Sequence, residues 1–175
     1  MLLLGVCLAH AADAPVFEIR EVQTRLEAGV YRLDARADIE FDAATLEALQ
    51  SGVPLTVIFD MEVMRERALM NERIAHVTAR YRLEVHALSG QYVVSNTGTG
   101  TSRNFRTYPE ALLDLGQLHD FPLFDAALLE PDEHYLLRVR ARLDIEALPS
   151  PMRLVAYFDS LWRLPNSWST WELRP

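Results

Sequence analysis

The stretch YRLDARADIEF, residues 31–41, alternates an apolar or small residue with a charged one at every position. Side chains of an extended strand point to opposite faces in turn. One face of this segment would therefore be charged, and the other would carry Tyr31, Leu33, Ala35, Ala37, Ile39 and Phe41. This pattern is typical of an antiparallel strand with one buried face and one face in water. We therefore expect Leu33→Asp to unfold the protein and Asp34→Asn to have almost no effect.

The same two-residue alternation recurs at residues 16–26, 55–63, 75–87 and 135–145, and turn residues such as Gly29 and Gly90 separate several of these segments. Residues 91–95 and 102–106 predict one more hairpin. Asp42 caps a predicted helix to about residue 50, and Thr107 and Glu110 have the spacing of a capping box before a second short helix. Residues 118–134, LHDFPLFDAALLEPDEH, are predicted to be a proline-interrupted crossover.

These segments predict an all-β fold, an antiparallel β-sandwich of about eight strands that is immunoglobulin-like in general architecture, with two short helices in crossovers. A small barrel is the alternative. A parallel α/β sheet would need many more helices than the sequence offers. The length of 175 residues favours one domain, which we place at residues 13–175.

The first residues, MLLLGVCLAHAADA, have the grammar of a secretory signal. An apolar run precedes Ala9-His10-Ala11, which fits the A-x-A cleavage pattern, so residues 1–12 are predicted to be a signal peptide and the mature chain to be periplasmic. The alternatives are an N-terminal membrane anchor and a lipoprotein at Cys7. The run is too short to cross a bilayer by itself, so no stable membrane insertion of the mature chain is expected.

Composition removes several classes of activity. All 17 basic residues are arginine, which excludes Schiff-base, P-loop and general-base lysine chemistry. The net charge of -8 makes nucleic acid an unlikely partner. Cys7 is the only cysteine, so the mature chain has no disulfide, thiol nucleophile or thiolate metal site. The histidines are scattered, and His119 beside Asp120 is the best of them for a site role. We expect no cofactor, no metal and no enzymatic activity.

Two groups of side chains are candidates for binding a partner. Arginines on the outward parity of two long strands would make one arginine-rich face if those strands were paired, and three tryptophans gather near the C-terminus. The candidate residues are Arg80, Arg82, Arg138, Arg140, Arg142, Trp162, Trp168 and Trp171. The competing interpretations are cross-strand ion pairing for the arginines and closure of the sandwich end for the tryptophans.

Four phrases in the chain carry a resemblance to a known family: YRLEVHALSGQYVVSN, RTYPEALLDLG, RVRARLDIEALPSPMRLVAY and WRLPNSWSTWEL. Together they resemble the uncharacterised exported proteobacterial proteins called domain of unknown function 4390, over nearly the whole mature chain. The chain departs from that pattern at Arg65 to Asn71, where relatives often carry consecutive tryptophans. The resemblance implies no catalytic residue. By association alone, it implies a periplasmic accessory of a membrane sensor kinase or of another envelope protein.

The leading hypothesis is a non-enzymatic periplasmic module that binds a protein partner through the arginine-rich face or the tryptophan end. The alternative is a periplasmic carrier of a small anionic or apolar ligand held between the sheets. A carrier requires an internal cavity, whereas an enzyme requires a convergent polar cluster in a pocket.

Overall fold

The computed structural model describes residues 15–150, 153 and 167–173. The predicted signal peptide and Trp162 lie outside the described residues. The described part contains two α-helices, α1 (Ala43–Gln50) and α2 (Tyr108–Leu115), and two 3-10 turns, η1 (Ala126–Leu128) and η2 (Ile145–Ala147). Its nine strands are β1 (Val16–Glu27), β2 (Val30–Glu40), β3 (Leu55–Arg65), β4 (Glu72–Val85), β5 (Tyr92–Asn96), β6 (Ser102–Phe105), β7 (Gln117–Asp125), β8 (Tyr135–Leu143) and β9 (Ser169–Leu173).

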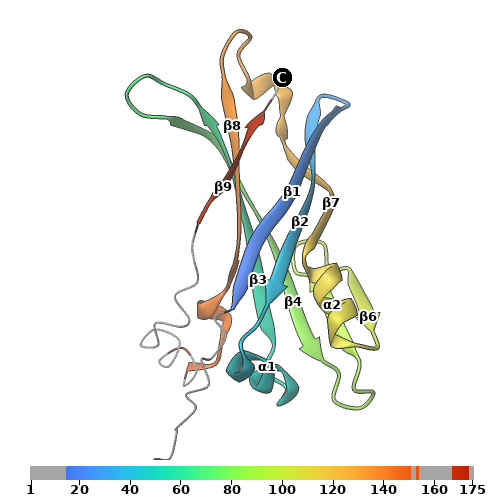
Figure 1. Cartoon of the computed structure of the whole chain (residues 1–175). Helices are drawn as coiled ribbons and strands as arrows, with labels where there is room; N and C mark the ends of the chain where they lie inside the picture. Colours follow the sequence, from blue (N-terminus) through green and yellow to red (C-terminus); the bar gives the residue numbers. More distant parts are fainter. Residues whose placement is uncertain (1–14, 151–152, 154–166, 174–175) are drawn as a thin grey trace, which may run out of the picture.

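The strands form two antiparallel sheets, which confirms the predicted sandwich (Figure 1). The smaller sheet has the order β1-β2-β7, and the larger has the order β6-β5-β4-β3-β8-β9. The sheets face each other over most of their length, but the β3–β4 hairpin and β8 diverge from β1, β2 and β7 at the upper end of the view. This divergence leaves strand ends and loops exposed at that end.

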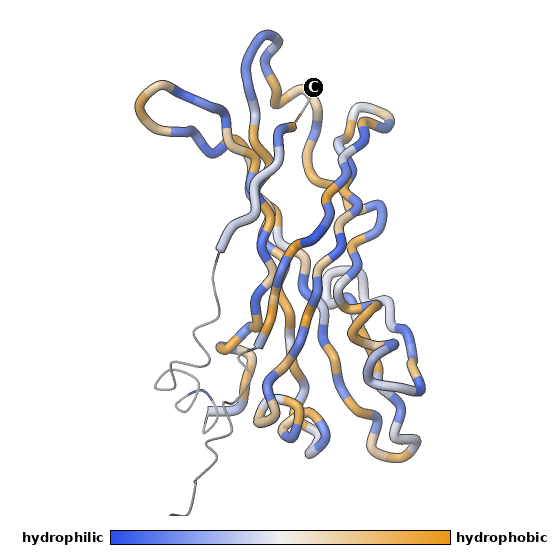
Figure 2. Tube along the Cα trace, viewed as in Figure 1, coloured by the Kyte–Doolittle hydropathy of each residue, from blue (hydrophilic) through white to orange (hydrophobic). Residues whose placement is uncertain are grey.

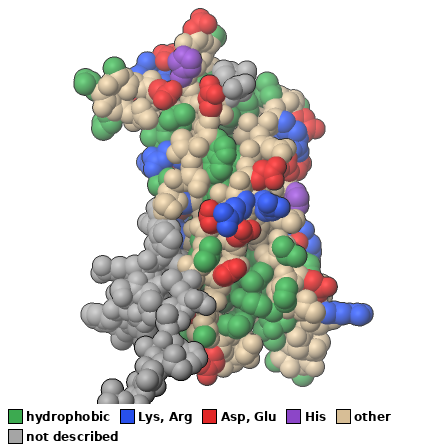
Figure 3. Space-filling view, in the orientation of Figure 1, with side chains coloured by type: hydrophobic (Ala, Val, Ile, Leu, Met, Phe, Trp, Pro, Cys, Tyr) green, Lys and Arg blue, Asp and Glu red, His purple; other side chains and the backbone are tan. Residues whose placement is uncertain are grey.

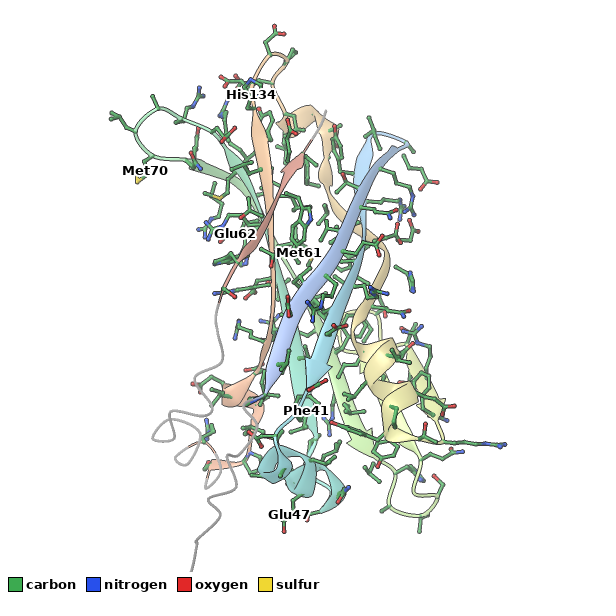
Figure 4. All side chains as sticks on the ribbon, in the orientation of Figure 1. Phe41, Glu47, Met61, Glu62, Met70 and His134 are labelled. Carbon is green, nitrogen blue, oxygen red and sulfur yellow. The ribbon has the colours of Figure 1, made fainter. Side chains whose placement is uncertain are left out.

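The core lies between the two sheets and is built from the apolar parity of every long strand. Leu33, Leu83 and Val139 are each 0% exposed, as the alternation predicted. Apolar and polar positions alternate along the strands in Figure 2. Met61 lies among the strands in Figure 4, while Glu62, the next residue, lies on the outer side of β3. Period-two patterning alone therefore accounts for the inner surface of the sandwich.

β3 departs from simple alternation because both of its faces are buried. Ile58, Asp60, Glu62 and Met64 have the outward parity, yet each is at most 8% exposed. β3 is a central strand with a partner on each edge, and long side chains of those partners lie over its outer face. This is why its outer face is buried as well as its inner face. The outer surface of the larger sheet is thus more enclosed than the sequence pattern suggested.

The prediction of a crossover over residues 118–134 is wrong for residues 118–125, because these belong to β7. Pro122 is tolerated there because β7 is an edge strand, and β2 is its only partner among the described strands. Its register shifts twice, and between Leu118 and Phe121 it contains one more residue than the facing segment of β2. This bulge interrupts the two-residue alternation, so the sequence pattern does not indicate a strand here.

Candidate functional site

The predicted arginine-rich face lies on the outside of the six-stranded sheet, but its two strands are not neighbours. β3 runs between β4 and β8 and pairs with both. In the register of β3 and β8, Asp60 is opposite Arg140. Two residues further along the same strands, Glu62 is opposite Arg138. Acidic side chains therefore separate the arginines, and the structure shows the ion-pairing arrangement that was the competing interpretation.

Asp60 binds two of these arginines. Its side chain is only 4% exposed. Its Oδ2 accepts hydrogen bonds from Nε of Arg140 at 3.0 Å and from Nε of Arg142 at 2.8 Å. Burial alone would raise the pKa of this carboxyl, but the hydrogen bonds and charges of Arg142 and Arg140 outweigh it and hold the pKa of Asp60 below its usual range. Asp60 is therefore an ionised anchor for both guanidiniums.

Glu62 has the same role next to Asp60. Its carboxylate lies 3.0 Å from Nη1 of Arg73 and 3.7 Å from Nη1 of Arg138. Arg82 pairs instead with Glu84 on its own strand, at 3.0 Å between Nε and Oε2. Arg80 differs from these, because its side chain is exposed and no described acidic group forms an ion pair with it.

The two described tryptophans, Trp168 and Trp171, do not form one exposed cluster. The guanidiniums of Arg138 and Arg140 lie 4.7 Å and 4.3 Å from the centre of the Trp168 ring, at cation–π distance. Trp171 has the opposite parity and packs against the core. Trp162 lies outside the described residues. The partner-binding role of the eight predicted residues stays a prediction, but four of the arginines already have charge partners within the sheet.

A different surface combines exposed apolar groups with a rigid support, and we call it the hairpin end. It consists of the β3–β4 loop, residues 66–71, and the β7–β8 connection, residues 126–134. Leu69 is 101% exposed, Met70 82% and Leu128 51%. Met70 stands at the far end of the hairpin, and His134 lies on the neighbouring loop (Figure 4). Apolar, acidic and histidine side chains lie side by side there in Figure 3.

Ion pairs connect the two loops of the hairpin end. Arg65 lies 2.6 Å from a carboxylate oxygen of Glu130, and Arg67 lies 2.8 Å from one of Glu133. The backbone N–H of Glu66 also donates to the carbonyl of His134 at 2.9 Å. These links hold the base of the hairpin against the β7–β8 connection while Leu69 and Met70 project beyond it.

A second surface feature is a groove along one side of the sandwich, where β7 comes near β4 and β5. Two hollows of ≈ 300 Å³ and ≈ 340 Å³ share Tyr81, Asn96, Thr99 and His119 in their linings. One wall comes from β4 and from the β5–β6 turn at residues 96–101, and the other comes from β7. We call this feature the edge groove.

His119, the histidine that the sequence favoured for a site role, stands at the β7 bulge beside this groove. Its Nε2 lies 2.9 Å from Oε1 of Gln117, and its Nδ1 lies 3.7 Å from Oδ1 of Asp34. Asp120, the next residue, has a φ of 50°, and its N–H donates to Asp34 at 3.0 Å. That hydrogen bond, together with Arg25, lowers the pKa of Asp34. Both ring nitrogens of His119 thus face polar groups of the smaller sheet.

Asp114 on α2 borders the same region. Burial raises the pKa of its carboxyl, although Arg103 at 2.9 Å and the charge of His119 act in the opposite direction. Arg103 itself lines the groove with Tyr81 and Asn96. The groove therefore combines hydrogen-bonding groups with an apolar wall, a composition suited to binding.

The described part of the chain has neither a metal-binding cluster nor a membrane-spanning helix. No three or more His, Cys, Asp and Glu side chains there are grouped so that they could hold a metal ion. None of the described helices has the length and apolar character needed to span a bilayer.

Comparison with known proteins identifies a family and little else. No curated protein and no solved structure matches the chain. One family model matches, over residues 14–172. That range takes in all nine described strands except the last residue of β9. The chain belongs to the family described as domain of unknown function (DUF4390).

Proposed function

We propose that the protein is a non-enzymatic, exported binding module that docks onto another envelope protein through its hairpin end. The observation that carries this proposal is the exposure of Leu69 and Met70 at the end of a braced hairpin. Two consecutive large apolar side chains that are almost fully exposed to water are unfavourable for an isolated protein. They become favourable when a partner covers them.

The physical gain from docking is substantial at this site. Fully burying a leucine or methionine side chain is worth about 1.5–3 kcal/mol. The ion pairs of Arg65 and Arg67 already order the hairpin base, so less conformational entropy is lost on binding. Exposed acidic groups in the same two loops, such as Glu66 and Asp132, favour a partner surface with an apolar pocket and a basic rim.

Export is part of the proposal because of the sequence of the first residues. The apolar run and the A-x-A pattern at residues 9–11 support secretion, and a chain whose one cysteine lies before the cleavage point suits an oxidising compartment. On the family resemblance, a membrane sensor kinase is the first partner to test.

The geometry favours a protein partner over a small ligand carried between the sheets. Inner-face side chains such as Phe59, Leu137 and Val139 are 0–1% exposed and occupy the interior themselves. The two hollows of the edge groove lie instead along the side of the sandwich, between β7 and the β4–β5 region.

Site-specific photo-crosslinking in the native host tests the proposal. A photoreactive amino acid replaces Leu69, and the matched control carries it at Leu88, which is 95% exposed in the β4–β5 turn. We expect one envelope protein to crosslink at Leu69 and not at Leu88, and Met70→Asp to abolish that adduct. Equal adducts at both positions, or none at Leu69, would refute docking through the hairpin end. Mass spectrometry of the adduct then decides whether the partner is a sensor kinase.

A further inference from the structure

Within the described part of the chain, the edge of β4 that faces away from β3 is unpaired along most of its length. β4 has 14 residues, but β5 pairs only with Tyr81–Val85. The last bond on this edge is the one from the N–H of Thr97 to the carbonyl of Arg80, at 2.9 Å. In an antiparallel strand the backbone groups of alternate residues point to the same side. Those of Thr78 and His76 therefore point, like the carbonyl of Arg80, toward the open edge.

This edge lacks most of the features that protect other edges from strand pairing. β6 has only four residues and β9 only five. β7 contains Pro122 and the bulge at Asp120. By contrast, β4 keeps a regular register with β3 from Ala75 to Leu83, and its open stretch includes β-branched residues and no proline. A long, regular, unpaired edge is a template for an added strand.

The edge groove lies directly beside this template. The ≈ 300 Å³ hollow is lined by residues 78–81 of β4 on one side and by residues 119–122 of β7 on the other. On the inner side of β4, Ala79 and Tyr81 are buried and Val77 is half-buried. Phe121 and Pro122 add apolar surface across the groove. Alternate side chains of a strand laid along β4 would therefore face an apolar surface.

The other side chains of an added strand would face the outer surface of the sheet beside Arg80. Its cross-strand neighbour on β3 is Ile58, which cannot neutralise its charge. Arg80 is thus a guanidinium positioned to pair with a carboxylate on the added strand, and cross-strand opposite charges stabilise a sheet.

We propose that the edge groove binds an extended segment of a partner protein by strand addition to β4, with apolar side chains facing Ala79 and Phe121 and an acidic side chain beside Arg80. Backbone hydrogen bonds to Thr78 and His76 supply affinity, and the alternating side chains supply selectivity. The proposal concerns a surface separate from the hairpin end, so either can fail without the other.

The probe is a phage-displayed library of linear peptides about nine residues long, a typical strand length. We expect enriched peptides to alternate apolar and polar residues and to contain an acidic residue on the polar parity. Hydrogen exchange should show new protection at the amides of Thr78 and His76. Absence of any enriched sequence, or protection confined to another strand, would overturn the proposal.

Variants of β4 separate backbone pairing from side-chain effects. Thr78→Pro removes the amide that faces the open edge, and Thr78→Ala keeps that amide while removing the hydroxyl. Binding should weaken about tenfold or more in the proline variant and little in the alanine variant. If Thr78→Pro does not fold, a peptide N-methylated at one ladder position tests the same bond and should lose a similar factor. Unchanged affinity would contradict strand addition.

Charge exchange tests the acidic residue. Arg80→Glu should weaken the selected acidic peptides about tenfold, and replacing their acid by arginine should restore binding to that variant. If binding is not restored, Arg80 does not pair with the acidic residue of the bound segment. The rival occupant of the β4 edge is a second copy of this chain, and sedimentation of the protein alone tests it. A dimer in which the amides of Thr78 and His76 are protected would show that a second copy, and not a partner protein, pairs with β4.

Discussion

The outer face of β3 and β8 and the hairpin end are both rich in charge. They differ in whether their side chains already have partners within the protein. On the outer face, Asp60 and Glu62 are buried beneath the arginines that neutralise them. At the hairpin end, the ion pairs lie at the base and leave Leu69 and Met70 exposed. The first region is complete within the chain, whereas the second gains only when something else covers it.

This difference shows that charge density is a poor guide to a binding surface. A guanidinium such as that of Arg142, already bonded to Asp60, would have to give up that bond before it could bind a partner. An exposed leucine has no such competing contact. The comparison predicts that changes on the outer face lower stability and that changes at the hairpin end lower binding.

The largest loss of stability is expected from a substitution in the inner core, and the losses in the two regions are compared with it. Leu33→Asp places a charge at a position that is 0% exposed and should cost about 4 kcal/mol or more, enough to unfold the domain. Its neighbour Asp34 should not be neutral, contrary to the expectation from the sequence. Asp34 accepts the Asp120 N–H and pairs with Arg25, so Asp34→Asn should cost about 1 kcal/mol. Urea unfolding measures both, and equal losses would contradict the assigned faces.

The next effect is on the outer face. Asp60→Asn leaves Arg140 and Arg142 without their shared carboxylate and should cost about 2 kcal/mol, since both arginines keep some contact with solvent. Glu47→Gln on the exposed side of α1 is the matched control and should change stability by less than about 0.5 kcal/mol. A neutral Asp60→Asn would mean that the outer face contributes nothing to the fold.

The pH dependence of stability also tests the contribution of Asp60. The pKa of Asp60 is lower in the folded state, so the ionised carboxylate stabilises the fold fully above its unfolded pKa of about 3.9. That contribution is lost as pH falls through the folded pKa. The gap between the wild type and Asp60→Asn should therefore stay constant from about pH 7 to pH 5 and shrink below about pH 4. A gap as large at about pH 3 as at about pH 7 would exclude Asp60 as the source.

The smallest effect on stability is expected at the hairpin end. Leu69→Asp and Met70→Asp replace side chains that contact mostly water, so each should change the free energy of unfolding by less than about 0.5 kcal/mol. Thermal melts of the purified variants measure this. A loss comparable with that of Asp60→Asn would show that the tip is structural.

The sequence predicted the sandwich because alternation is a local property, and Leu33, Leu83 and Val139 are all buried as expected. It missed β7, because the bulge at Asp120 and the proline at position 122 interrupt the period that reveals a strand. For the candidate site, it placed Arg138 and Arg140 on the outward parity but could not tell which strand lies between β4 and β8. Strand order depends on long-range packing. The outward parity of Asp60 and Glu62 was the available signal for ion pairing. Exposure of Leu69 was not predictable, because it depends on how far the hairpin projects.

The central claim is that the hairpin end serves binding and the outer face serves stability. The most direct test is whether a protein with two substitutions at the hairpin end still forms its complex. The Leu69→Asp, Met70→Asp protein is compared with Asp60→Asn for the yield of the envelope complex at equal folded concentration. We predict that the hairpin variant melts like the wild type and forms no complex, while Asp60→Asn melts lower and still binds. A hairpin variant that retains its partner would contradict the central claim.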